Sequence, residues 1–467
     1  MKKGNFWALL PIGVFLILFL GSGVLIGDFY VMSALLCFLV ALAVAMLQNK
    51  KVSFGEKLGT FAKGVGEKNI ITMILIFLCA GMFSGAVGSI GGVESTVNFG
   101  LSILPPELAV VGLFIIGCFI STAMGTSVGT ITAIAPIGYG ISVATGISAP
   151  LCLAAVVSGA MFGDNLSMVS DTTIAAVSTQ GCNMRDKFKR NFFIVLPAAI
   201  ISCVVFYFIT MGEVADIPEI GGYNFWKIIP YLFVLISAIA GLNVFLVLTG
   251  GTVLSLVIGL FLGDSSITMV SMLKGIGSGI TSMYDIALIS LVVAGVVEII
   301  KANGGIDAII YLIRKSVKGK RGAQAGIALL VTLVDFFTAN NTVAIVISGP
   351  IAKDIASEFD VDPRTSASLL DIFGSFAQGV IPYGAQLLAA GSFVFAGLPV
   401  QVSPVEIMPF LIYPYLMAIS AIIFIAFFSL KKFGKKDKGQ KQPEKQEELL
   451  HNKQNSKAVI VTAFFIC

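Results

Sequence analysis

Long apolar runs, separated by short polar or glycine-rich segments, dominate the pattern along this chain. Examples are Phe6–Leu20, Met73–Val87, Phe192–Thr210 and Ile407–Leu430, and with their flanks such runs are long enough to cross a hydrocarbon core as helices. Their apolar positions do not alternate with polar ones, as they would in the strands of a membrane barrel. The pattern therefore predicts an all-α, polytopic membrane protein. A second span follows the first run directly, without a small-residue cleavage site, so we expect a retained helix and not a signal peptide.

Composition supports this prediction. Over 467 residues the chain is 57% hydrophobic and 12% charged, whereas soluble proteins carry roughly a quarter charged residues. The net charge of +4 is concentrated in a few loops and indicates no nucleic-acid partner. Seven cysteines stand singly, which favours small buried side chains over metal or disulfide roles. The only histidine, His451, lies in a charged tail, so proton chemistry inside the membrane has to use carboxylates.

The chain also repeats itself. Asn5–Pro11 (NFWALLP) is echoed by Asn224–Pro230 (NFWKIIP), and these segments hold the only two tryptophans. Further on, Met124–Pro136 corresponds to Thr338–Pro350. Because all such pairs are separated by about the same distance, we interpret the chain as two copies of one helical unit.

These repeats predict the domain organisation. A transmembrane domain is expected over residues 1–430, with its repeats at about 5–211 and 224–430. Residues 431–467 form a tail rich in Lys and Glu that we expect to be disordered at the cytoplasmic surface. Its final apolar stretch, 458–467, is too short to span a membrane.

Charge predicts how the halves are related. Loops rich in Lys and Arg stay cytoplasmic, and we place Lys50–Lys68, Arg185–Arg190 and Arg314–Arg321 on that side. The repeat counterpart of the last segment is the neutral stretch Gly100–Glu107, so the halves are predicted to be inverted in the membrane. Each half then crosses an odd number of times. Both termini are expected in the cytoplasm of a bacterial cell with the protein in its inner membrane.

Two polar segments interrupt apolar runs at equivalent places in the repeats. They are Gly125–Thr130 (GTSVGT) and Thr338–Thr342 (TANNT). Inverted repeats commonly bind ions where broken helices meet near mid-membrane, so we predict a break in each segment and candidate ligands at Thr126, Ser127, Asn340 and Asn341. Ordinary helix packing through small hydroxyl residues is the alternative.

A further polar stretch, Gly163–Thr173, follows an apolar run. Carboxylates at membrane depth are costly and tend to be functional. The repeat counterpart, Ala377–Gln386, carries neutral polar groups in place of both aspartates. The candidates from these two stretches, with two further intramembrane carboxylates, are Asp164, Asp171, Thr172, Thr173, Gln378, Asp335 and Asp371. For each aspartate the alternative is a helix cap or a loop residue.

The GTSxGT segment, the stretch GDxLSxxSDTT at Gly163–Thr173 and the TANNT segment resemble the NhaC family of sodium/proton antiporters. This resemblance covers the chain up to about Leu430 and implies a fold of inverted repeats with paired hairpins. The family also contains members resembling a malate/lactate exchanger and amino-acid carriers. The chain departs from the family pattern at Asn165, Met168 and Ile174, where the family has Lys, Pro and Asn.

The resulting hypothesis is a secondary transporter that exchanges sodium for protons by alternating access. Competition of proton and sodium for one desolvated carboxylate couples the two fluxes, and carboxylate, hydroxyl and amide oxygens suit a hard cation. We assign the binding of both ions to Asp164 and Asp171, support to the hydroxyls of Thr126, Ser127, Thr172 and Thr173, and the opposite wall to Asn340 and Asn341.

The leading alternative is a sodium- or proton-coupled carrier of a small organic solute, such as an amino acid or a carboxylate of the malate/lactate type. The site region contains a larger number of polar side chains than a bare cation needs, among them Gln378, Tyr383 and Gln386. A channel fits paired repeats less well, and an enzyme is the class that the sequence favours least, since it offers no nucleophile motif. Apart from the transported ions we expect no cofactor. Membrane lipid is the expected partner, and a homodimer is left open.

Overall fold

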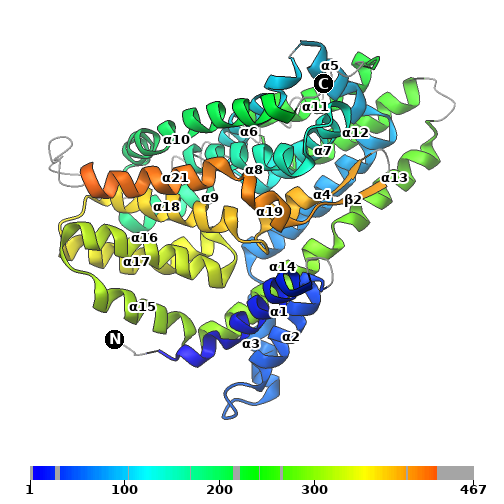
Figure 1. Cartoon of the computed structure of the whole chain (residues 1–467). Coiled ribbons are helices and arrows are strands. Elements are labelled where there is room, and N and C mark those ends of the chain that lie inside the picture. Colours follow the sequence, from blue (N-terminus) through cyan, green and yellow to red (C-terminus); the bar gives the residue numbers. More distant parts are fainter. Residues whose placement is uncertain are drawn as a thin grey trace, which may run out of the picture. The chain divides into compact units, whose positions relative to one another are not determined.

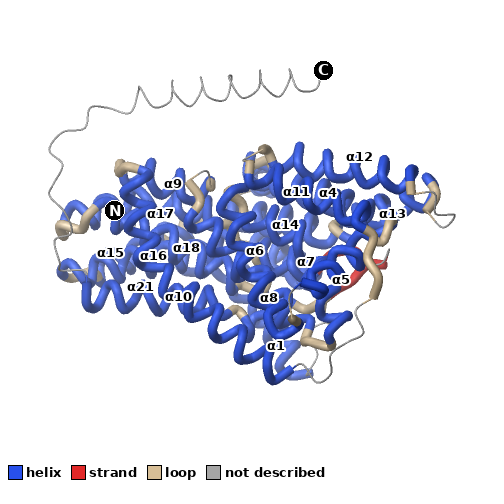
Figure 2. Tube along the Cα trace, turned by 90° about the horizontal axis from the view of Figure 1, so that it is seen from above, coloured by secondary structure: helices blue, strands red, loops and turns tan. Residues whose placement is uncertain are grey.

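The computed structural model describes residues 4–26, 32–103, 105–168, 170–213, 221–240, 242–262, 267–395 and 398–428. These residues form helices almost throughout (Figures 1 and 2), as the apolar pattern predicts. The predicted tail at 431–467 lies outside the described residues.

The first half consists of apolar helices joined by short turns. In chain order they are η1 (Phe6–Leu9), α1 (Leu10–Ile26), α2 (Ala34–Leu47), α3 (Phe54–Val65), α4 (Lys68–Ser89), α5 (Gly92–Ile103), η2 (Pro106–Leu108), α6 (Ala109–Met124), α7 (Ser127–Thr145), α8 (Ala149–Leu166), α9 (Asp171–Gln180) and α10 (Met184–Glu213).

The second half begins with helices that follow the same order as those of the first half. They are α11 (Phe225–Ile239), α12 (Val244–Phe261), α13 (Met269–Ser282), α14 (Tyr284–Ala302), α15 (Gly305–Ser316), α16 (Gly319–Thr338), α17 (Asn341–Glu358), α18 (Pro363–Val380) and α19 (Ala385–Gly391). After these come β1 (Ser392–Phe395), β2 (Leu398–Gln401), α20 (Pro404–Ile407), η3 (Met408–Phe410), α21 (Ile412–Ile423) and η4 (Phe424–Phe428). The series α6 to α9 and α16 to α19 follow the register of the sequence repeat; the inversion of the halves across a membrane stays a prediction.

Several helices have the length and apolar composition of membrane spans. Within the described ranges eight single helices qualify, or up to nine spans if a bent pair, Pro404–Phe410 with Ile412–Phe427 at 52°, is one span. The eight are Ile70–Ser89, Pro106–Met124, Ser127–Thr145, Ala149–Gln180, Met184–Met211, Val244–Phe261, Met269–Ala302 and Gly319–Thr338. The predicted multi-pass helical membrane fold is therefore confirmed.

Helices α8 and α18 form the centre of the molecule. Residues Leu151–Met161 and Thr365–Ser375 are buried at every position. The α8 segment is small and apolar on nearly all sides, whereas the α18 segment also buries the polar side chains of Thr365, Ser366, Ser368, Asp371 and Ser375. Helices α10 and α21 run side by side along the outside of this pair (Figures 1 and 2). The central position of α8 and α18 matters because the C-terminal ends of these two helices carry Asp164 and Gln378.

Glycines allow α4 and α13 to cross with their backbones in contact. A Cβ atom on Gly81 would lie 2.3 Å from the carbonyl oxygen of Gly279, and one on Gly85 would lie 2.1 Å from that of Gly275. Both helices thus present a glycine pair four residues apart, the pattern that permits close helix packing in membranes. This crossing ties the two halves together next to the candidate site, because α4 contributes to its lining.

Two segments interpreted as charged loops are helical instead. Most of Lys50–Lys68 forms α3, which begins with a capping box between Ser53 and Glu56. The segment Arg185–Arg190 forms the first turns of α10, where the Asn183 side chain accepts from the Arg185 N–H at 2.9 Å. The loop interpretation was wrong because low hydropathy excludes a membrane core but does not exclude a capped helix.

A short hairpin departs from the all-helical prediction. Strand β1 pairs antiparallel with β2, with Ser392 opposite Gln401. The hairpin packs against α4, since the Ser84 hydroxyl donates to the Val394 carbonyl oxygen at 3.1 Å. No strand is predicted here from the sequence, because strands of only four residues are too short to give a clear alternating pattern.

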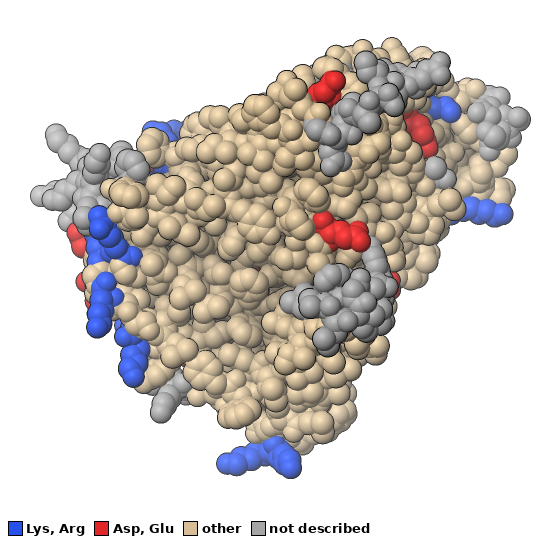
Figure 3. All heavy atoms as spheres, viewed as in Figure 1, with Lys and Arg blue, Asp and Glu red and all other residues tan. Residues whose placement is uncertain are grey.

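Charge distribution agrees with a membrane protein and allows a test of the inverted topology. On the face shown in Figure 3, Lys and Arg side chains lie along the margins, and the wide area between them is almost uncharged.

In a cysteine-free background, we expect Lys318→Cys to resist an impermeant thiol reagent in intact cells and Ser102→Cys to react. Both positions are exposed in the structure, so the comparison reports the side of the membrane. Labelling of Lys318→Cys from outside would show that the inverted arrangement is wrong.

Candidate functional site

The first predicted break lies between α6 and α7. Gly125 adopts a left-handed conformation with φ of 68°, which ends α6, and Thr126 then caps α7. The Thr126 hydroxyl accepts from the Gly129 N–H at 3.4 Å. A glycine is suited to this position because the left-handed region is sterically open to it. The break places the N-terminal N–H groups of α7 at the site.

The second predicted break has the same construction. Helix α16 ends at Ala339, which holds a left-handed φ of 48° without being a glycine, a conformation that costs about 1 kcal/mol or more. Asn340 caps α17 by accepting from the Val343 N–H at 3.0 Å. Both predicted breaks are therefore confirmed, at equivalent points of the repeat.

A third break separates α8 from α9 and carries Asp164 in the last turn of α8. Gly163 brings this turn directly against α6, because a Cβ atom at Gly163 would lie 2.5 Å from the Cys118 carbonyl oxygen. One turn earlier, the Ser121 hydroxyl of α6 donates to the Ala160 carbonyl oxygen at 2.6 Å. Close packing of α6 and α8 thus fixes the position of the carboxylate.

Asp164 is buried, with 4% of its surface exposed. Its Oδ2 accepts from the Ser127 hydroxyl at 2.8 Å and its Oδ1 from the Ser170 hydroxyl at 2.6 Å. The Ser170 and Thr172 hydroxyl oxygens are 2.8 Å apart. One carboxylate therefore links the starts of α7 and α9 to the end of α8.

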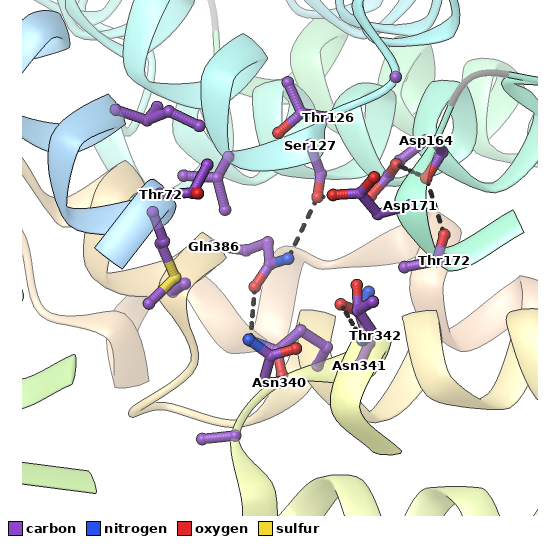
Figure 4. Close-up of a pocket in the computed structure, with 18 residues that line it drawn as sticks. Thr72, Thr126, Ser127, Asp164, Asp171, Thr172, Asn340, Asn341, Thr342 and Gln386 are labelled. Atoms are coloured by element: carbon purple, nitrogen blue, oxygen red, sulfur yellow. Dashed lines mark hydrogen bonds between the residues drawn. The ribbon is translucent and has the colours of Figure 1, made fainter. Parts of the chain in front are cut away.

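A hydrogen-bonded chain continues from Asp164 into the second half. The Gln386 Nε2 donates to the Ser127 hydroxyl oxygen at 3.1 Å, and the Gln378 Nε2 donates to the Gln386 Oε1 at 2.8 Å. Figure 4 shows Ser127, Asp164 and Asp171 on one side of the site, Asn340 and Asn341 on the other, and Gln386 between them. The two halves thus meet at this point through polar side chains.

These groups line a pocket with a volume of about 110 Å³. A water molecule needs roughly 10–15 Å³ of such volume, so the pocket has room for an ion with several waters. The predicted site residues that line it are Thr126, Ser127, Asp164, Asp171, Thr172, Asn340, Asn341 and Gln378. Asp171 is exposed, whereas Asp164 is buried. The structure brings these residues together; their roles stay predictions.

Three predicted residues do not line this pocket. Thr173 and Asp371 lie behind the third break, where the Thr173 hydroxyl donates to the Asp371 Oδ2 at 3.3 Å. Asp335 is fully buried. The backbone N–H groups of Asn340 and Gln378 act on Asp335 electrostatically, but neither of its carboxylate oxygens accepts a hydrogen bond of ordinary geometry from a described residue.

Sequence reasoning missed Lys187, which forms a buried ion pair with Asp371. We had placed this lysine in a cytoplasmic loop, although it lies in α10 and only 1% of its side chain is exposed. One signal was available: Lys187 and Asn191 are four residues apart and share a helix face. That spacing places a charged and an amide side chain together at the start of a long apolar helix.

Broken spanning helices around a buried carboxylate are features of a membrane transporter. A family model described as "Na+/H+ antiporter family" matches residues 4–212 and 217–428, which is most of the chain. The chain therefore belongs to the Na+/H+ antiporter family, and the resemblance noted in the sequence is confirmed.

Several characterised transporters are similar in sequence to this chain over most of their length. The chain is 24% identical to the malate-2H(+)/Na(+)-lactate antiporter of Bacillus subtilis, over 84% of this chain and 90% of the relative. It is also 24% identical to the Na(+)/H(+) antiporter NhaC of the same organism, over 77% and 86%. The arginine/ornithine antiporter ArcD of Halobacterium salinarum is 23% identical over 73% and 74%.

Proposed function

We propose that this protein exchanges sodium ions for protons across the bacterial inner membrane, as a secondary transporter that works by alternating access. The observation that carries the proposal is Asp164, a buried carboxylate that borders a pocket lined by helix breaks from both halves. Family membership supports the exchange of these two ions.

Asp164 binds the proton and the sodium ion in turn. A carboxylate away from water is unstable as an isolated anion, so it is accompanied either by a proton or by a cation. The Ser127 and Ser170 hydroxyls each donate to one of its oxygens and can rotate to present their own oxygens to an ion. Since proton and sodium exclude each other at this group, movement of one is coupled to movement of the other.

The remaining predicted residues complete the binding site. Asp171, exposed at the pocket, attracts cations, and Thr126 and Thr172 supply hydroxyl oxygens to the same wall. Asn340, Asn341 and Gln378 supply amide oxygens from the second half. Asp335 is a second buried carboxylate for proton transfer, a role that intramembrane carboxylates serve in pumps and transporters. Because the walls come from different halves, a relative movement of the halves opens the pocket to alternate sides.

A sodium- or proton-coupled carrier of an organic solute is the second candidate. The names of two relatives, the malate/lactate and arginine/ornithine antiporters, favour it. So do the N-terminal ends of α7 and α17 at the pocket, which attract anionic groups such as a substrate carboxylate. The family itself, which is described by sodium and protons, favours the first candidate.

Transport by the purified protein in proteoliposomes separates these functions. We expect an imposed sodium gradient to drive proton movement in the opposite direction, with saturation and without a response to potassium. The same vesicles are tested with labelled amino acids and dicarboxylic acids. Sodium-driven uptake of an organic solute, with no proton flux in its absence, would establish the second candidate instead. Ion flux that does not saturate would indicate a channel.

A further inference from the structure

Lys187 lies behind the break between α8 and α9, on the side away from the pocket. Its Nζ donates to the Asn165 carbonyl oxygen at 3.1 Å and to the Thr173 hydroxyl at 2.9 Å, and it forms an ion pair with the Asp371 Oδ2. The side chains of Lys187 and Asp371 are 1% and 0% exposed. The three protons of the ammonium group thus have three oxygen partners in a site without water access.

These oxygens belong to three separate elements and three chemical classes. The carbonyl is at the C-terminal end of α8, the hydroxyl is in the first turn of α9, and the carboxylate is on α18. Asn191, one turn after Lys187, donates to the same Asn165 carbonyl oxygen at 2.8 Å. Carbonyl, hydroxyl and carboxylate oxygens are also the ligands of hard metal cations. The cluster therefore has the ligand set of a monovalent cation site.

The break between α8 and α9 makes contacts on two opposite sides, the pocket and Lys187, through residues adjacent in the chain. Asp164 and Thr172 point to the pocket, while Asn165 and Thr173, the next residue in each case, meet Lys187. The charge of Asp371 acts on Asp164 from the other face of the break. Lys187 neutralises Asp371. Asp164, the buried carboxylate that lines the pocket, has no basic partner among the described side chains.

We propose that Lys187 is a tethered cation that permanently fills a second monovalent-cation site, made by the Asn165 carbonyl, Thr173 and Asp371. It limits the transporter to one mobile cation, bound at Asp164. The limit on mobile cations rests on the proposed function, whereas the existence of the second site does not. Removing the ammonium group should therefore open a site that free sodium can occupy.

Thermal unfolding of the purified full-length protein tests the site without any transport measurement. A thiol-reactive fluorophore reports unfolding, because buried residues such as Cys37 and Cys152 become accessible. The measurements use Asp164→Asn as the reference, so that sodium at the pocket does not contribute. We expect Lys187→Ala in this background to lower the unfolding midpoint by about 5 °C in choline chloride, and sodium chloride at equal ionic strength to restore most of the loss.

Two further variants distinguish a cation site from a structural ion pair. Adding Asp371→Asn to Lys187→Ala should remove the sodium response, because the carboxylate ligand is gone. Lys187→Arg, which keeps the charge, should show no sodium response. If Lys187→Ala does not accumulate, Lys187→Gln replaces it, since the amide can still donate to the Asn165 carbonyl. Equal midpoints in sodium and choline for Lys187→Ala or its substitute would overturn the proposal, and so would a sodium response that survives Asp371→Asn.

Transport then connects the site to the stoichiometry. With Asp164 intact, the Hill coefficient for sodium should rise from about 1 to about 2 in Lys187→Ala. An unchanged coefficient would overturn the limit to one mobile cation. Absence of sodium flux in the wild-type protein would refute the proposed function and the limit on mobile cations that rests on it, whereas the unfolding experiment decides the existence of the Lys187 site independently.

Discussion

An Asp164→Asn variant is expected to reach the membrane in folded form and to lose sodium-dependent proton flux in proteoliposomes. The amide can neither take up a proton nor neutralise a cation, so the step that couples the two ions is removed. Loss of a buried charged ligand costs about 3 kcal/mol or more in binding, which corresponds to cation affinity weakened roughly 100-fold. Sodium-driven pH changes inside the vesicles measure the flux directly.

The local geometry explains why this variant should still fold. Both partners of Asp164 are the hydroxyls of Ser127 and Ser170, which can rotate from donating to a carboxylate oxygen to accepting from an amide N–H. Asp354→Asn is the control, because Asp354 is exposed and pairs at 3.7 Å with Arg314 away from the pocket; it should transport normally. Normal sodium- and pH-dependent transport in both Asp164→Asn and Asp171→Asn would refute the assignment and favour Asp335, the other buried carboxylate without a basic partner among the described residues.

The largest effect on stability is expected from Gly279→Leu in α13. A Cβ atom at Gly279 would lie 1.9 Å from the Gly81 carbonyl oxygen, and backbone cannot move aside as a flexible side chain can. Helices α4 and α13 would have to separate, which should lower the free energy of unfolding by about 3 kcal/mol or more. We expect little folded protein in detergent extracts of membranes, as measured by size-exclusion chromatography.

Gly277→Leu, in the same helix, is a matched control. A Cβ atom at Gly277 would meet nothing within 4 Å, so the same substitution there should leave the yield of folded protein near that of the wild type. Leucine even has the better helix propensity. Similar losses in both variants would mean that bulk in α13, and not the contact with α4, is responsible. Similar normal yields would mean that the backbone contact at Gly81 does not exist in the membrane.

The helix breaks illustrate what could be predicted from sequence. Two polar segments could be recognised because each interrupts an apolar run: Gly125–Thr130 and Thr338–Thr342. Their equivalent positions in the sequence repeat supported the same interpretation for both. A left-handed residue followed by a capping side chain is a local structure, and the residues that form it are adjacent in the chain. Asp164 stood out for a related reason, since a carboxylate beside apolar residues is rare enough to be noticed.

The partners of these residues were not predictable in the same way. Asp371 was grouped with the ion-binding carboxylates, but its charge is met by Lys187, a residue 184 positions away that we had assigned to a loop. Likewise, Ser127 is joined to Gln386 across 259 positions. Such pairings depend on how α10 packs against α18 and α7 against α19. That packing depends on side-chain volumes throughout the core, which leave no periodic signal in the sequence.

The sequence by itself therefore determined that this is a helical membrane transporter with a repeated pattern, interrupted spans and intramembrane carboxylates. Periodicity, local backbone conformation and the cost of charge in lipid act over short stretches and are visible in the order of residues. Only the tertiary structure decided which carboxylates border the pocket and which one is neutralised by a lysine. Electrostatic interaction depends on distance in space, and distance in space is set by the packed helices.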